Sequence, residues 1–108
     1  MSYKIDAILN FQKEAKRLMK KYPSLKNELY ELGEMLSENP KTGESIGNSC
    51  YKIRLAIAST GKGKSGGARV ISYVYVTKTI VYLLSIYDKS EKENISESEL
   101  KKLLGAIK

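Results

Sequence analysis

Three apolar runs joined by short connections constrain the fold of this chain more than any other sequence feature. Residues 51–58, 69–77 and 80–87 carry alternating or β-branched and aromatic side chains, with turn residues between the runs. The last two runs are separated only by a tight turn around Lys78, which leaves no room for a helix that crosses back to a parallel strand. The sequence therefore predicts an antiparallel meander, with residues 69–77 as its central strand.

Two helical stripes precede these strands. Their apolar residues recur at spacings of three and four: Phe11, Ala15, Leu18, Met19 and Tyr22, then Leu25, Leu29, Leu32 and Leu36. Asn10 is the predicted N-cap of the first helix, Pro23 ends it, and Asn39 before Pro40 ends the second. The pair predicts a helical hairpin with a short joint.

The ends of the chain complete the predicted fold. Residues 3–8 alternate as a short strand, and residues 41–49 read as a loop. Ser96 and Glu99 form a capping box for a helix that runs to about Ala106. The prediction is an α+β fold in a single domain, residues 1–108, with an N-terminal strand and helical hairpin packed on an antiparallel sheet.

Composition excludes several kinds of chemistry. The chain has no histidine, which removes nucleophiles activated by a histidine base and most transition-metal sites. Cys50 is the one cysteine, so neither an internal disulfide nor a cysteine zinc site is possible. Neither a membrane-spanning run nor a signal-peptide pattern is present, and we expect a cytoplasmic protein that needs no cofactor or metal.

The positive charge is concentrated in the middle of the sequence. Residues 45–87 contain six Lys or Arg and no Asp or Glu, so they carry +6 of the net +7. Strand alternation places Lys52 and Arg54 on one face, and Arg69 opens the neighbouring strand. Cations gathered without acids predict a phosphate-facing site, with nucleic acid as the partner.

A glycine-rich loop, residues 61–67, lies between these cations and contains Lys62 and Lys64. Its Gly-Lys-Ser string suggests a nucleotide-binding P-loop, but Ala58 stands where that pattern needs glycine, and a strand follows instead of a helix. We expect the loop to fold back over the face that carries Lys52 and Arg54. The alternative is a flexible hairpin loop whose lysines only make it soluble.

Two further features have both a structural and a functional interpretation. The first helix is basic on its outer faces, which indicates a solvated surface or an auxiliary contact with phosphates. Tyrosines on the predicted sheet belong to the core or to a surface on which RNA bases stack: Tyr51, Tyr73, Tyr75, Tyr82 and Tyr87. We expect most of them in the core and select Tyr87, close to Lys89, as the exception.

Four segments carry a family resemblance: Tyr51-Lys52-Ile53-Arg54, Gly63-Lys64-Ser65-Gly66-Gly67, Arg69-Val70-Ile71 and Ile86-Tyr87-Asp88-Lys89-Ser90-Glu91. With these segments in this order, the chain resembles the RelE/HigB superfamily of toxins from type II toxin–antitoxin systems. The Lys-Ser-Gly-Gly-x-Arg string resembles its HigB-like branch. The resemblance implies a RelE-like fold, with helices packed on an antiparallel sheet.

The resemblance also implies an activity. Members of the superfamily act as mRNA interferases: they enter the ribosomal A site, beside the 16S rRNA, and cleave the message there, which inhibits translation. The 2′-hydroxyl of the RNA attacks the adjacent phosphodiester, and the reaction needs no metal. An antitoxin, with a helix-turn-helix DNA-binding region, is the implied protein partner.

Residue by residue, Lys52 and Arg54 match the family's strand cations, Arg69 matches the arginine that stabilises the phosphorane, and Lys89 matches a later cation. The sequence departs from RelE where Ser90 replaces an arginine and where a C-terminal tyrosine is missing, for which Tyr87 is the possible substitute. The candidate catalytic residues are Lys52, Arg54, Lys64, Arg69, Tyr87 and Lys89, with the general acid and base unassigned. The candidate nucleic-acid contacts are Lys62, Lys64 and Lys78.

Two other functions remain open from sequence. One is a ParE-like inhibitor of DNA gyrase with the same fold, and the other is a non-catalytic RNA-binding module. The cations gathered on one face argue against a pure protein binder, but gripping and cleaving RNA use the same residue types. We further expect Arg69 to be partly exposed to solvent, so that replacing it would cost little stability.

Overall fold

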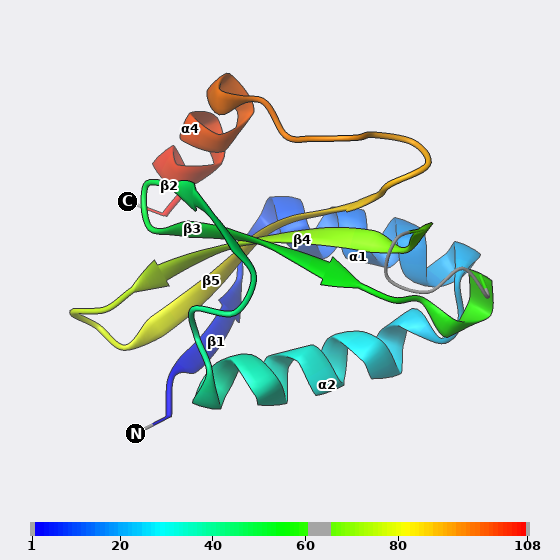
Figure 1. Ribbon diagram of the computed structural model, residues 1–108, viewed down its shortest axis with the longest axis horizontal. Helices are drawn as coiled ribbons and strands as arrows, with labels where there is room; N and C mark the ends of the chain where they lie inside the picture. Colours follow the sequence, from blue (N-terminus) through cyan, green and yellow to red (C-terminus); the bar gives the residue numbers. More distant parts are fainter. Residues whose placement is uncertain (1, 61–65, 108) are drawn as a thin grey trace.

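The computed structural model describes residues 2–60 and 66–107 (Figure 1). The elements follow in the order β1 (Lys4–Ala7), α1 (Leu9–Lys21), α2 (Leu25–Glu38), β2 (Glu44–Gly47), β3 (Cys50–Leu55), the 3-10 turn η1 (Ala58–Thr60), β4 (Ala68–Tyr75), β5 (Ile80–Asp88) and α4 (Glu97–Gly105). The predicted α+β fold is confirmed. None of the helices within the described residues has the length and apolar character to cross a membrane.

The strands form one sheet in the order β1-β5-β4-β3-β2. Strands β3, β4 and β5 are the predicted antiparallel meander. Strand β1 joins the sheet at its edge, parallel to β5, with Lys4 beside Ile80 and Ala7 beside Leu83. The sheet is therefore mixed, because the long connection from β1 to β5 allows a parallel pairing that short turns do not.

Strand β2 lies within residues 41–49, so the prediction of a continuous loop there was wrong. It pairs with β3 through a tight turn in which Asn48 and Ser49 have φ of 55° and 61°. Left-handed backbone at both central residues suits a two-residue hairpin, and asparagine adopts it more readily than most residues. The Asn-Ser pair was the sequence signal for this hairpin.

Both long helices pack on the same face of the sheet. Leu18 of α1 and Leu25 and Leu36 of α2 are fully buried there, against residues such as Val70 and Val81 of the strands. Helix α1 begins at Leu9, so the predicted N-cap at Asn10 was wrong by position. The side-chain amide of Asn10 instead donates to the Glu14 carboxylate and to the Leu84 carbonyl oxygen.

Helix α4 covers the opposite face of the sheet, so that the strands lie between it and α2 (Figure 1). Leu100 is 4% exposed and packs with Cys50, Ile71 and Leu84. The predicted capping box is confirmed, since Ser96 accepts from the Glu99 amide and Glu99 reaches back to the Ser96 amide. The hydrogen bonds of this capping box therefore fix the start of α4, and leucine contacts hold the rest of the helix on the sheet.

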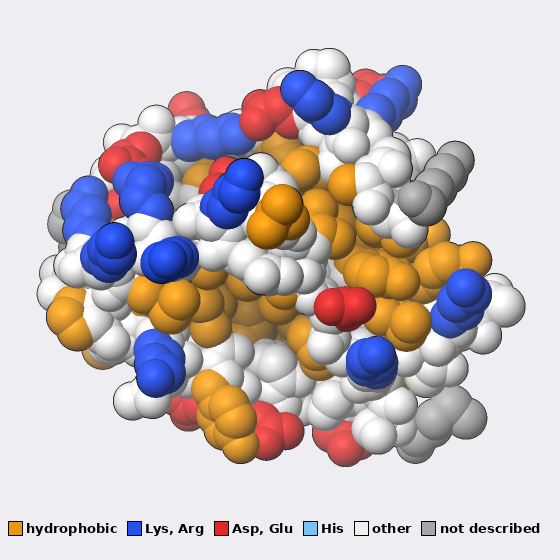
Figure 2. All heavy atoms as spheres, turned by 180° about the vertical axis from the view of Figure 1, so that it is seen from behind, with side chains coloured by type: hydrophobic (Ala, Val, Ile, Leu, Met, Phe, Trp, Pro, Cys, Tyr) orange, Lys and Arg blue, Asp and Glu red, His pale blue; other side chains and the backbone are white. Residues whose placement is uncertain are grey.

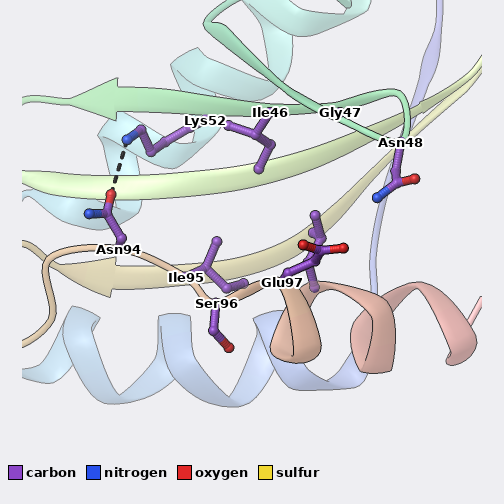
Figure 3. Close-up of a pocket in the computed structure, with 9 residues that line it drawn as sticks. Ile46, Gly47, Asn48, Lys52, Asn94, Ile95, Ser96 and Glu97 are labelled. Atoms are coloured by element: carbon purple, nitrogen blue, oxygen red, sulfur yellow. Dashed lines mark hydrogen bonds between the residues drawn. The ribbon is translucent and has the colours of Figure 1, made fainter.

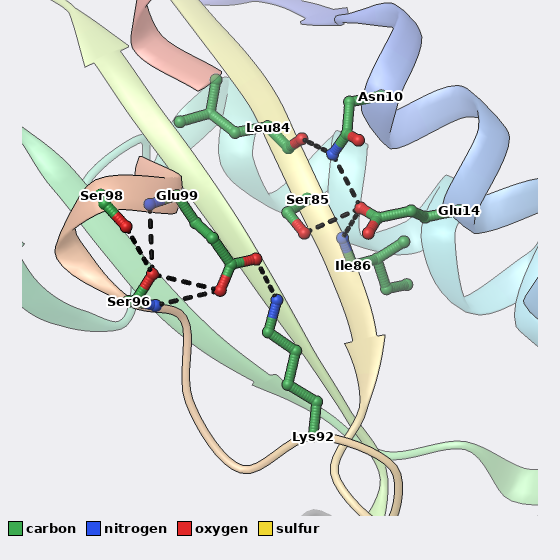
Figure 4. Close-up of polar contacts among 9 residues, drawn as sticks. All are labelled: Asn10, Glu14, Leu84, Ser85, Ile86, Lys92, Ser96, Ser98 and Glu99. Carbon is green, nitrogen blue, oxygen red and sulfur yellow. Dashed lines mark hydrogen bonds and ion pairs between the residues drawn. The ribbon is translucent and has the colours of Figure 1, made fainter. Parts of the chain in front are cut away.

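A β-bulge interrupts the pairing of β4 with β5, between Ile71 and Ser72. Glu14 of α1 stabilises the irregular part of β5 (Figure 4). Its Oε1 accepts from the Ser85 hydroxyl at 2.8 Å and from the Ile86 amide at 3.2 Å. The same oxygen accepts from the Asn10 side chain at 2.9 Å, so one carboxylate satisfies three donors at the interface of helix and sheet.

Replacing Glu14 with alanine should lower the free energy of unfolding by about 2 kcal/mol, because it leaves donors on β5 without their acceptor. Urea denaturation followed by circular dichroism measures the difference. Glu31, an exposed acid on α2, is the matched control, and Glu31→Ala should change stability by less than about 0.5 kcal/mol. Equal stability of the two variants would mean that the Glu14 contacts contribute nothing net.

Candidate functional site

The site begins with a row of side chains across three neighbouring strands. Arg54 on β3 lies opposite Arg69 on β4, and Arg69 lies opposite Tyr87 on β5. Directly opposite residues of antiparallel strands point to the same face of the sheet. Two guanidinium groups and a phenol therefore share one line, on the face that also carries α4.

The members of this row differ in exposure. Arg54 is exposed, whereas Arg69 is 3% and Tyr87 4% exposed. The expectation that Arg69 is partly exposed to solvent was therefore wrong. The choice of Tyr87 as the sheet tyrosine outside the core was also wrong, since it is buried with Leu84 and Leu100. Strand β4 is the middle strand of the sheet, and its whole first half is buried, so even a charged side chain there is covered. The Arg69 Nη1 donates to the Ala68 carbonyl oxygen at 3.1 Å.

Lys52 lies two residues before Arg54 on β3, and its side chain reaches Asn94 across the hollow beside α4 (Figure 3). Its Nζ donates to the Asn94 Oδ1 at 3.2 Å and lies 3.8 Å from the Glu44 Oε1. Glu44 is the β2 residue paired with Lys52 in the sheet register, and it stands just before the acid-free part of the sequence. The Lys52 side chain keeps 21% of its surface exposed.

Lys92 is a further candidate site residue, which the sequence did not indicate. Its Nζ lies 5.3 Å from the centre of the Tyr87 ring, within the range of a cation–π contact. Glu99 of α4 holds the same ammonium group in an ion pair (Figure 4). The sequence offered only a charged loop over residues 88–94, in which no spacing distinguishes Lys92 from its neighbours.

Burial raises the pKa of Tyr87, while the charge of Arg69 lowers it in part. The net pKa is above the ordinary value, so Tyr87 keeps its proton at neutral pH. Among the described residues its hydroxyl has no hydrogen-bond partner. A buried hydroxyl donor without an acceptor is uncommon in folded proteins, and the residue that carries it lies opposite Arg69.

Asp88 anchors the segment that follows β5. It is 2% exposed and accepts hydrogen bonds from the Tyr22 hydroxyl at 2.5 Å and from the amide and hydroxyl of Ser90 at 2.9 and 2.7 Å. Burial acts to raise its pKa, but these hydrogen bonds and the Lys21 charge outweigh it and lower the pKa to about 2. The carboxylate thus stays charged at neutral pH and connects the segment after β5 to the end of α1.

The remaining predicted residues lie in different places. Lys89 follows β5 with an exposed side chain, and its amide donates to the Gly67 carbonyl oxygen at 3.1 Å. Lys78 lies in the β4–β5 turn, beyond the far end of β4 and about 20 Å or more from Arg69 at the usual rise per residue. The structure therefore does not bring Lys78 to the arginine row. Lys62 and Lys64 lie outside the described residues.

The basic residues of α1 are also exposed: Lys13, Lys16, Arg17, Lys20 and Lys21. Arg17 pairs with Glu91 at 2.8 Å. Lys and Arg side chains gather over the half of the molecule that carries α1 when it is seen from behind (Figure 2). This helix packs on the sheet face opposite the arginine row, so its lysines and the row cannot contact the same phosphate.

A hollow of about 430 Å³ lies between the β2–β3 hairpin and the start of α4. Lys52 and Asn94 line one part of it, and Asn48 and Ile46 another (Figure 3). Lys52 and Arg54 also line a second hollow beside Gly43. The half-buried Lys52 and the exposed Arg54 therefore border concave surface rather than an open face.

Comparisons with known proteins agree with this fold. The family model described as "RelE toxin of RelE / RelB toxin-antitoxin system" matches residues 8–107. A double mutant of the E. coli toxin RelE in the free state is similar over all of both chains, with 20% identity and a TM-score of 0.66.

The isolated E. coli RelE toxin is similar over 99% of this chain and 100% of its own, with 22% identity and a TM-score of 0.63. A RelE double mutant in complex with an antitoxin RelBc peptide is similar over 94% of this chain and 93% of its own, with 24% identity and a TM-score of 0.60. At these identities the solved structures establish the fold, and the HigB-like branch remains a prediction.

Proposed function

The chain belongs to the RelE toxin family of toxin–antitoxin systems, and from this premise we propose that it is an endoribonuclease that cleaves mRNA on the ribosome. The observation that carries the proposal is the row formed by Arg54, Arg69 and Tyr87, with Lys52 nearby on the same strand. A binding surface for protein alone would not need two arginines aligned with a buried phenol.

The proposed reaction uses a nucleophile that belongs to the substrate. The 2′-oxygen of one nucleotide attacks the adjacent phosphorus, and the bond from phosphorus to the 5′-oxygen of the next nucleotide breaks. The products are a 2′,3′-cyclic phosphate and a free 5′-hydroxyl. Negative charge grows on the phosphorane oxygens, where guanidinium groups stabilise it without taking part in proton transfer.

Among the two arginines, Arg54 is the exposed one and is the proposed phosphate contact. Arg69 lies beneath the surface, so its proposed role is to add positive potential to the row and to support it. Tyr87, protonated at neutral pH, supplies a hydroxyl donor for the phosphorane or for the leaving 5′-oxygen. Lys92 covers the Tyr87 ring and must shift for the phenol to be reached.

The proposed protein partner is an antitoxin, as in the similar E. coli structure of RelE with an antitoxin peptide. A chain with pI near 9.4 attracts acidic partners, and an antitoxin that covers the arginine face would keep RNA away from it. We further propose that this antitoxin has a helix-turn-helix DNA-binding region. The proposed place of action is the ribosomal A site beside the 16S rRNA, in the cytoplasm.

Primer extension on a message bound to purified ribosomes tests this function. New 5′ ends of the downstream fragment at codon positions, formed only when the toxin is present, would support it. Inhibited translation without cuts would indicate a non-catalytic RNA binder. DNA breaks that depend on gyrase, with the message intact, would indicate a ParE-like inhibitor and contradict the proposal.

A further inference from the structure

A third hollow lies on the same sheet face as the arginine row, at the other end of the β4–β5 hairpin. We propose that this hollow, the tyrosine pocket, binds one base of the same single-stranded RNA. The tyrosine pocket is lined by Tyr73, Tyr75 and Tyr82, by Asn48, Ser49 and Lys78, and by Leu104 and Ile107 of the C-terminal segment. The inference rests on the proposed function and adds a subsite to it.

The size and chemistry of the tyrosine pocket suit a nucleobase. Its volume is about 660 Å³, within the range of sites that take small organic ligands. Three phenol rings provide flat aromatic surface, while Asn48 and Ser49 provide amide and hydroxyl groups for base edges. No acidic side chain lines it among the described residues.

The three rings form a connected aromatic surface. Tyr73 and Tyr82 are stacked, with ring centres 6.3 Å apart and planes 22° apart. Tyr75 meets Tyr73 edge-on, with ring centres 5.9 Å apart. Tyr73 and Tyr82 also pack against the core beneath α4, whereas Tyr75 belongs to neither buried cluster. Tyr75 is half-buried, and of the three rings it is the one outside the core clusters, so it is the ring proposed to stack on the base.

Lys78 gives the tyrosine pocket a positive charge next to its aromatic wall. The Lys78 Nζ lies 5.7 Å from the centre of the Tyr75 ring, and the side chain is exposed. A base stacked on Tyr75 would carry its phosphate on the side where this ammonium group lies. The neighbouring Thr79 has φ of 58°, a conformation that costs energy for a β-branched residue and holds the turn in an unusual shape.

A chain of hollows links the tyrosine pocket to the arginine row. Asn48 lines both the tyrosine pocket and the hollow beside α4. Lys52 lines the hollow beside α4 and also the hollow beside Gly43, which Arg54 borders. An RNA strand that follows these hollows would meet Arg54, Lys52 and Lys78 in turn, with Glu44 and Glu97 also at the borders of the linking hollows. The cations therefore lie along a path for a backbone rather than around one phosphate.

The space-filling view shows the surface at this end of the molecule. Hydrophobic side chains gather around the tip of the β4–β5 hairpin and below the C-terminal end of α4, with cationic side chains and an acidic one at their edges (Figure 2). Leu104 and Ile107 add apolar lining to the pocket. Its three tyrosines and one lysine, with no acid in the lining, fit a base and its phosphate.

The test uses the full chain and a 2′-O-methyl RNA of about six nucleotides. This RNA resists cleavage and carries 2-aminopurine at one position, which is moved along the strand. When 2-aminopurine occupies one position, distant in the strand from the phosphate that Arg54 contacts, its fluorescence should be quenched on binding. Tyr75→Leu should abolish that quenching and weaken binding about tenfold.

Tyr30→Leu is the matched control, because Tyr30 is a tyrosine on α2 with 70% exposure and no place in the site. It should bind the RNA as the parent protein does. Lys78→Ala should lower the salt dependence of binding by about one phosphate contact. Circular dichroism of the Tyr75→Leu variant confirms that a weaker complex does not reflect unfolding.

Equal binding by Tyr75→Leu and Tyr30→Leu, or no binding by the parent protein, would overturn the subsite. So would a Tyr75→Leu variant that binds RNA normally but loses an antitoxin peptide, since the pocket would then dock protein. Cleavage of ribosome-bound message by the parent protein is measured alongside. Intact cleavage with an inert pocket rejects only this inference, and absent cleavage rejects the proposed function itself.

Discussion

Arg54→Ala should reduce cleavage of ribosome-bound message about 100-fold or more and relieve growth inhibition, while the protein stays folded. Loss of one donor that stabilises developing charge typically costs this much in rate. Arg54 is exposed and lies at the edge of two hollows, so its removal leaves no buried cavity. We expect the free energy of unfolding to change by less than about 0.5 kcal/mol.

Arg54→Lys separates charge from geometry. If Arg54 needs its planar fork to hold the phosphorane, lysine should restore binding of the message but recover little of the cleavage rate. Single-turnover primer extension with saturating protein measures the cleavage rate apart from binding. A folded Arg54→Ala variant that cleaves at the parent rate would remove Arg54 from the site.

Arg69→Ala should behave differently, because the side chain that it removes is 3% exposed. The Arg69 side chain is covered in the folded protein, and we expect a loss of about 2 kcal/mol or more in stability together with the loss of activity. The two arginine variants thus distinguish a surface contact from a buried support, although both residues belong to the same row.

Stability should depend on Asp88 and should lose that contribution in acid. Its pKa is lowered from 3.8 to about 2 in the folded protein, so the folded state favours the charged form by about 2 kcal/mol. This contribution is present in full above the unfolded pKa, near pH 4 and higher. It is lost as the pH falls toward 2, where the folded carboxyl also takes up a proton.

Urea denaturation of the parent protein and Asp88→Asn at several pH values measures this linkage. The difference between them should be about 2 kcal/mol at pH 7 and should shrink steadily below pH 4. Glu93, an exposed acid in the same loop, is the control, and Glu93→Gln should show no such dependence. A difference that persists unchanged at pH 2 would mean that the Asp88 charge is not what stabilises the fold.

Local patterns predicted the fold well where each element carried its own signal. The leucine spacing gave α2, the capping box gave the start of α4, and the short turn around Lys78 gave the β4–β5 hairpin. Strand β2 and the parallel partner of β1 were not predicted. Glu44–Gly47 has few β-formers and becomes a strand through pairing with β3, which depends on the tertiary fold.

The sequence predicted which residues share a face of the sheet better than it predicted how deeply each of them is buried. Alternation predicted that Lys52 and Arg54 share a face, and sheet register adds Arg69 and Tyr87 to it. Nothing in a strand pattern tells how deeply its first residue lies, since that depends on the elements packed above it. Lys92 reaches Tyr87 through an irregular loop, whose path no periodicity predicts.

The position of Arg69 in the middle strand has a genetic consequence. If cells are forced to survive expression of this gene, substitutions at Arg54 and at Arg69 should both appear among the survivors. The first class should yield normal amounts of inert protein, and the second should yield little protein because proteases remove it. Abundance measured across such a population would therefore map which cations the scaffold itself requires.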